Sequence, residues 1–307
     1  MALSHLHLVL NHLPVIGSVI ALGLLLLSLV RRSADLRRAG LEVFVFVGLL
    51  TLPVYLSGVG AGLPLRQEAS NAVVQAHHDA ALLGSMFMLL TSVAAWLGLW
   101  QTRRITRPAR GVFGAVLLLA VVTLALMGRA ANLGGQIRHP EVTVLQAAQT
   151  VEPSAWLNAS IAEVATTRTW AWPAAEALHF IGLWLLFGIV LAVNLRLLGM
   201  MKQVPFATLH RLLPWAMLGL TINLVTGMVF VIGSPGQYVG WPFYWKIGLL
   251  LVGGFNLLYL TIVDAPWSVG RGEHAPVLAR TLAGGGIVAW LAVMYFGRML
   301  PFLGNAF

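Results

Sequence analysis

Long runs of apolar residues alternate along the chain with short polar segments. Eight runs are long enough to cross a bilayer as helices, which takes about 20 residues each. Leu, Val, Ala and Gly dominate these runs without a two-residue alternation, and this argues against the strands of a membrane barrel. The pattern predicts an all-α, polytopic membrane protein with about eight transmembrane helices. The runs cover roughly residues 6–30, 41–60, 79–100, 112–130, 174–198, 211–233, 243–263 and 281–303.

Composition supports this fold class. Of the 307 residues, 59% are apolar and only 9% are Asp, Glu, Lys or Arg, whereas soluble domains carry about 25% charged residues. Such a chain cannot cover its surface for water, which excludes a soluble enzyme, a disordered segment and a nucleic-acid-binding protein. The absence of Cys excludes disulfides, thiolate metal sites and covalently attached c-type haem.

Basic residues predict the orientation of the helices. Of the 19 Lys and Arg residues, 13 fall in the loops after the first, third, fifth and seventh runs, and six fall on the other side. Because cytoplasmic loops are enriched in Lys and Arg, both termini should lie outside. The first run lacks a basic leader and is read as a spanning helix rather than a cleaved signal peptide. We expect a bacterial inner-membrane protein.

One long connection divides the chain. Residues 131–173 join the fourth and fifth runs on the outer side and contain short amphipathic pieces around Pro153. These pieces predict surface helices that cover an outer site. The expected organisation is a four-helix half over 1–130, this outer segment, and a second four-helix half over 174–307.

Histidines are the main chemical signal. Seven of the nine fall on the predicted outer side, and ionisable residues in membrane segments are costly and usually functional. His12 and His78 lie at similar depth near the outer ends of the first and third runs. Two imidazoles at one depth can supply both axial ligands of haem b. Pro14 and the glycines nearby would let the helices splay around such a group.

Other residues extend or compete with this site. His7, His77 and His179 are substitute ligands or ligands of a second site. Cations for the haem propionates are expected from Arg66, Arg129 and Arg138, which equally could bind lipid phosphates. Glu176 and His179, three residues apart on one helix, are an alternative metal pair.

Two motif-level resemblances accompany these residues. The stretch from Leu6 to Gly17, with the later His78-Asp79-Ala80-Ala81, resembles uncharacterised bacterial membrane proteins that begin with an LHLxLNHxPVxG motif. The later pieces at 178–182, 194–199 and 212–215 resemble a second uncharacterised family of small membrane proteins. There an Asp often replaces Asn194. The chain looks like a fusion of the two, and neither resemblance implies an activity.

The leading hypothesis is a b-type cytochrome-like subunit that transfers electrons at the outer face. It would connect quinone or a periplasmic c-type cytochrome with a partner complex, and whether it is itself an enzyme stays open. The first alternative is a periplasm-facing copper or other metal site, since imidazole also binds Cu and Zn. The second is a structural anchor subunit without a cofactor, whose histidines lie among lipid headgroups.

Overall fold

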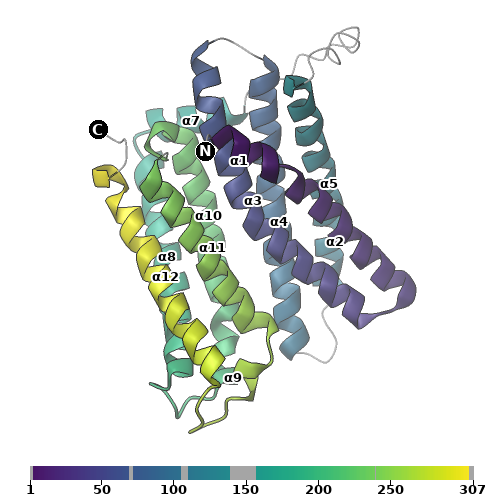
Figure 1. Cartoon of the computed structure of the whole chain (residues 1–307), viewed down its shortest axis with the longest axis vertical. Helices are drawn as coiled ribbons and strands as arrows, with labels where there is room; N and C mark the ends of the chain where they lie inside the picture. The colour runs from purple at the N-terminus through teal and green to yellow at the C-terminus, as the bar shows by residue number, and fades with distance from the viewer. Residues whose placement is uncertain (1–2, 69–71, 105–109, 139–156, 239, 304–307) are drawn as a thin grey trace. The chain divides into compact units, whose positions relative to one another are not determined.

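The computed structural model describes residues 3–68, 72–104, 110–138, 157–238 and 240–303. Throughout these ranges the regular structure is helical (Figure 1). Eight helical stretches are long and apolar enough to cross a membrane, which confirms the predicted fold class. In lipid, a helix satisfies all its backbone hydrogen bonds internally, and this is why runs of this length fold as helices. The spans are His5–Arg31, Ala34–Gly60, Val73–Thr102, Gly111–Ile137, Ala171–Leu198, Phe206–Gly233, Trp241–Ile262 and Val277–Leu300.

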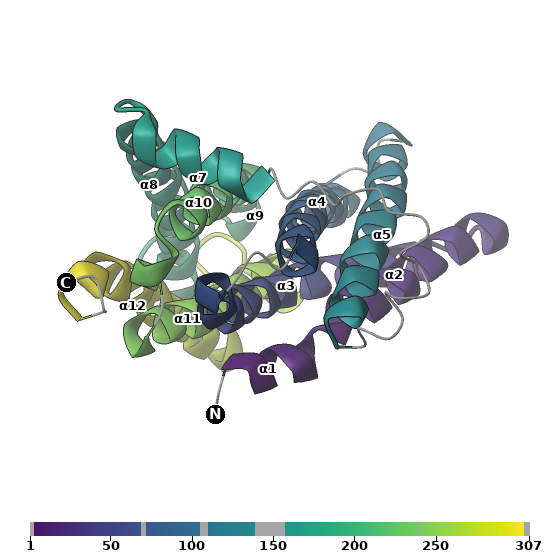
Figure 2. The same ribbon diagram turned by 90° about the horizontal axis from the view of Figure 1, so that it is seen from above.

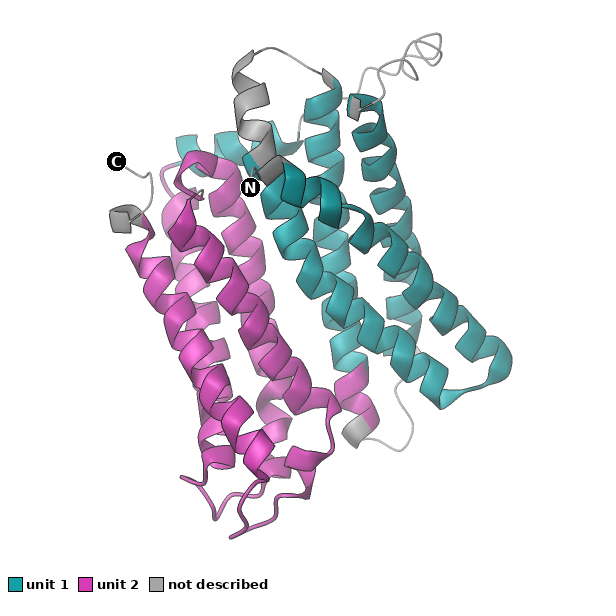
Figure 3. Cartoon of the chain, in the orientation of Figure 1, with its two compact units in different colours: residues 1–98, 107–168 teal, residues 99–106, 169–307 magenta. Residues whose placement is uncertain are grey.

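The chain forms two compact units (Figure 3). Unit 1 comprises residues 1–98 and 107–168, and unit 2 comprises residues 99–106 and 169–307. Each unit is described by itself below.

Unit 1 contains the first four membrane spans and a short helix. Its elements are α1 (Leu3–Leu10), α2 (His12–Arg31), α3 (Ala34–Glu68), most of α4 (Ala72–Arg104), α5 (Arg110–Arg138) and α7 (Leu157–Thr167). The predicted outer segment is represented by α7, while its part at 139–156 lies outside the described residues.

The first membrane span is interrupted between α1 and α2. The interruption falls at Asn11, and Pro14 explains it, because proline lacks the N–H that would bond the Leu10 carbonyl and its ring crowds that carbonyl. The Asn11 amide still bonds the His7 carbonyl at 2.8 Å. The turn therefore separates the part of the span that carries His7 from the part that begins with His12.

Small residues let the helices of unit 1 approach closely. A Cβ at Gly17 of α2 would collide with Val47 of α3, and one at Gly48 of α3 would collide with Ser92 of α4. Thr91 and Thr123 join α4 and α5 by a buried hydroxyl–hydroxyl bond of 2.8 Å. Small residues at interfaces and interhelical hydrogen bonds are how helices associate in lipid.

Unit 2 contains the last four spans. They are α8 (Ala171–Leu198), α10 (Leu213–Gly233), α11 (Trp241–Ile262) and α12 (Val277–Leu303), joined by the short elements α9 (Phe206–Leu209), η2 (His210–Leu212), η3 (Pro235–Tyr238) and η4 (Ala265–Ser268). Seen from above, α8 lies beside α10 and α11 beside α12 (Figure 2), and α8 also packs against α12.

Helices α8 and α10 cross with their backbones in contact. A Cβ at Gly219 would lie 2.6 Å from the Gly182 carbonyl oxygen and 2.7 Å from the Leu186 nitrogen. Neither Gly182 nor Gly219 has room for a larger residue. The crossing determines which residues of the two helices face each other one or two turns further along.

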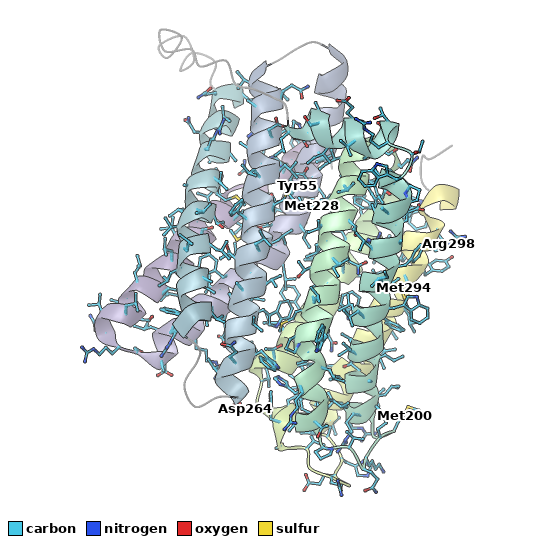
Figure 4. All side chains as sticks on the ribbon, turned by 180° about the vertical axis from the view of Figure 1, so that it is seen from behind. Tyr55, Met200, Met228, Asp264, Met294 and Arg298 are labelled. Atoms are coloured by element: carbon cyan, nitrogen blue, oxygen red, sulfur yellow. The ribbon has the colours of Figure 1, made fainter. Side chains whose placement is uncertain are left out.

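Buried polar side chains hold one end and the interior of unit 2. Met200 and Arg298 mark its opposite ends in Figure 4. At the Met200 end, the fully buried Arg196 donates to the backbone carbonyls of Val204, Gly270 and Glu273, tying two loops to α8. Within the bundle, Asn194 donates to Asn256, which donates to the Leu282 carbonyl.

Candidate functional site

His7 of α1 lies against α3. Its Nδ1 donates to the Val54 carbonyl at 3.0 Å, and Ser57 Oγ lies 3.5 Å from the same nitrogen while donating to that carbonyl. The imidazole is half-buried and rests on Gly58, where a Cβ would lie 2.8 Å from His7 Cε1. The ring therefore occupies a place on α3 that only a glycine leaves open.

His77 of α4 lies against α5 in a closely similar way. Its Nδ1 donates to the Ala130 carbonyl at 2.9 Å. A Cβ at Gly134 would lie 3.0 Å from His77 Cε1. Buried alanines at Ala76, Ala80 and Ala130 line the seam beside the ring.

The two histidines share one arrangement. Each Nδ1 bonds a helix carbonyl, and each ring lies on the glycine four residues after that carbonyl. A carbonyl oxygen only accepts hydrogen bonds, so Nδ1 carries the proton in both rings, and in neutral imidazole Nε2 keeps its lone pair. Metal-binding histidines are typically oriented by such a bond from the other ring nitrogen.

The rings of His7 and His77 also lie close to each other. Their centroids are 6.5 Å apart and their planes are inclined by 75°. Two imidazoles this close could bind one metal centre between them if their Nε2 atoms faced each other.

The two histidines and the two glycines beneath them lie near one face of the membrane. His7 and His77 stand near the beginnings of their spans, while Gly58 and Gly134 stand near the ends of the spans that run the opposite way. A group bound here would be close to the aqueous boundary.

His78 and Asp79 follow His77 in α4, and Asp79 connects this helix to α7. His78 is buried and its ring lies 6.3 Å from that of His77. The buried carboxylate of Asp79 accepts the backbone N–H groups of Leu157 and Asn158, at 2.9 Å each, and the Asn158 side-chain amide. Asp79 thus caps the N-terminus of α7 and holds this helix to α4.

The remaining predicted residues of unit 1 lie elsewhere. His12, beyond the turn at Asn11, is exposed, and its ring does not join those of His7, His77 and His78. Arg129 is exposed and immediately precedes Ala130, whose carbonyl accepts from His77. The side chains of Arg66 and Arg138 lie outside the described part. The structure therefore brings His7 and His77 together, with His78 beside His77, and does not pair His12 with His78.

A second cluster lies in unit 2. His179 Nδ1 lies 2.7 Å from Thr226 Oγ1, and this hydroxyl donates to the Ile222 carbonyl at 2.7 Å. When the hydroxyl proton makes that bond, Thr226 accepts from His179 Nδ1, and Nε2 keeps its lone pair. The Phe230 ring lies 5.5 Å from that of His179 and 5.0 Å from that of Trp172.

The contacts of Glu176 differ from those expected of a metal pair with His179. It is exposed and accepts from Trp172 Nε1 at 3.1 Å. Burial, with a smaller contribution from the Glu176 carboxylate, raises the pKa of Tyr238 to about 12. The Tyr238 phenol is therefore a hydrogen-bond donor at every physiological pH.

Some of these partners carry no signal in the sequence. Helix carbonyls belong to every residue, so Val54 and Ala130 could not be recognised as acceptors. The glycines at 58 and 134 are two among 32. Recognising these two glycines from the sequence would have required knowing beforehand which helices pack together.

Comparisons with protein-family models, with curated proteins and with solved structures found no match to this chain.

Proposed function

We propose that this multi-pass membrane protein binds haem b between His7 and His77 and carries electrons at the outer face of a bacterial inner membrane. The observation that supports this most directly is the shared arrangement of the two imidazoles. Both have Nδ1 bonded to a backbone carbonyl, and their centroids are 6.5 Å apart. Haem supplies one-electron chemistry whose potential depends on its axial ligands and surroundings.

The residues of unit 1 fit this group better than they fit a bare metal ion. Copper and zinc sites usually need three or four protein ligands. Among the described residues, no group of three or more His, Asp or Glu side chains could hold a metal ion. A porphyrin brings four nitrogens of its own, so two histidines suffice.

The protein's own side chains would orient the ligands and set their basicity. Val54 and Ala130 hold the imidazole planes through Nδ1, while Gly58 and Gly134 leave space for the rings. Arg129, exposed beside Ala130, is the proposed cation for a propionate. The electron donor and acceptor would be quinone and a periplasmic c-type cytochrome or another subunit.

The absorbance spectrum of the purified protein, oxidised and then reduced, tests the proposal. We expect the sharp reduced bands of a low-spin b-type haem and one porphyrin per chain on extraction. A preparation that holds no porphyrin after expression with haem supplied would contradict the proposal. Copper or zinc at stoichiometric amounts would favour the metal-site alternative. A protein that holds no porphyrin, copper or zinc would favour a structural subunit.

Adjacent glycines on α5 give a matched pair of variants. Gly134→Ala places a Cβ 3.0 Å from His77 Cε1, so the ring must shift slightly. A Cβ at Gly135 would meet no atom within 4 Å. We expect Gly134→Ala to weaken or shift the low-spin spectrum and Gly135→Ala to leave it unchanged. Equal spectra for the two variants would show that the ligand position does not depend on this contact.

A further inference from the structure

A lysine stands inside the membrane region of unit 2 without a carboxylate partner. Lys246 is half-buried on α11, in the span Trp241–Ile262. Among the described residues it forms no ion pair. Intramembrane cations are costly and usually serve a ligand or a transport path.

The end of the Lys246 side chain lies against α12 at Gly297. A Cβ at Gly297 would lie 3.4 Å from Lys246 Nζ and 3.5 Å from its Cε, so the absence of a side chain at this position leaves room for the ammonium group. His179 of α8 and Lys246 both stand near the beginnings of their spans, and α12 packs against both of their helices. The two groups therefore share one region of unit 2.

The groups around this region offer complementary hydrogen bonds. Lys246 can only donate, and His179 presents Nε2 as an acceptor in the tautomer whose Nδ1–H donates to Thr226. The Phe230 ring lies next to that of His179, and the Trp172 ring lies next to that of Phe230. A cation, an acceptor nitrogen and two aromatic faces would suit a flat ring that carries oxygen at both ends.

We infer that His179 and Lys246 form a binding site for the head group of a quinone or quinol. A quinone oxygen accepts from Lys246, and a quinol hydroxyl donates to His179 Nε2, while the ring packs on the aromatic side chains. Such a ligand is lipid-soluble and reaches the site from the bilayer. The inference rests on the proposed function in that it assigns the quinone partner to particular residues, but binding itself needs no haem.

Titration of the purified protein with a short-chain ubiquinone and with menadione, followed by calorimetry, tests this site. We expect one of the two probes to bind the wild-type protein. Lys246→Met and His179→Phe should each weaken that binding by about tenfold or more, as expected for loss of a hydrogen bond involving a charged or buried group. Lys202→Met is the matched control, because Lys202 is likewise half-buried but contacts His274 at the other end of unit 2.

Several outcomes would overturn the inference. Wild-type protein that binds neither probe, or variants that bind as tightly as the wild type, would contradict it. Binding of phosphatidylglycerol that depends on Lys246, without quinone binding, would assign the cation to a lipid phosphate instead. Melting temperatures of all variants, measured in parallel, identify any that fail to fold, and Lys246→Arg, which keeps the donor, should then retain binding.

The same preparations separate this inference from the proposed function. Quinone binding by protein that lacks a b-type spectrum would retain the site and remove the electron-transfer function. A b-type spectrum without quinone binding would do the reverse.

Discussion

Replacing either His7 or His77 with Ala should abolish the low-spin haem spectrum, whereas His12→Ala should leave it intact. His7 and His77 have their Nδ1 atoms bonded to carbonyls and their rings 6.5 Å apart, while His12 is exposed beyond the turn at Asn11. A haem held by both imidazoles would lose one of its two protein ligands in either variant, so its low-spin bands should disappear even where porphyrin is retained. Reduced-minus-oxidised spectra and the ratio of haem to protein measure this.

His78→Ala is the decisive comparison in this series. His78 is buried next to His77, so its loss should lower stability while the bis-histidine spectrum persists. His274→Ala, in a loop of unit 2 where His274 contacts Lys202, controls for histidine removal as such. Loss of the spectrum in His12→Ala and His78→Ala, with retention in His7→Ala and His77→Ala, would return the axial assignment to the pair favoured from the sequence.

Gly219→Ala should destabilise unit 2 by about 1–3 kcal/mol, the usual range for overpacking a tight interface. The added Cβ would meet backbone atoms of Gly182 and Leu186 at 2.6 and 2.7 Å, and backbone cannot move aside as a side chain can. The shift in α8 and α10 should also disturb the His179–Thr226 hydrogen bond, which lies further along the same helix pair. Thermal melting in detergent measures the first effect.

Gly227→Ala is the matched control on the same helix. A Cβ at Gly227 meets nothing within 4 Å, so this change should be neutral or slightly stabilising, because Ala favours helix over Gly. Similar melting temperatures for Gly219→Ala and the wild type would show that the crossing of α8 and α10 is looser than described.

The sequence alone predicted the membrane spans well, and the physical reason is general. A run of about 20 apolar residues in lipid must satisfy its backbone internally, so length and composition suffice to predict a helix. The eight spans of the structure overlap the eight predicted runs. The interest in histidines near the ends of the first, third and fifth runs also came from the sequence, because ionisable residues stand out against an apolar background.

Which histidines meet was decided only by the tertiary structure. Sequence spacing placed His12 and His78 at similar depth, but depth says nothing of which way a ring points or which helix it faces. The turn at Asn11 separates His7 from His12, and His7 contacts α3 through a carbonyl, Val54, that carries no mark in the sequence. The same holds for Ala130 beneath His77.

The capping of α7 by Asp79 and the pairing of His179 with Thr226 likewise join residues 78 and 47 positions apart. The sequence thus determined the number of helices and the residue types available for chemistry, because those depend on hydrophobicity along one segment at a time. The tertiary structure decided which of these residues become neighbours, because that depends on packing between segments, where a glycine or a backbone carbonyl matters as much as a histidine.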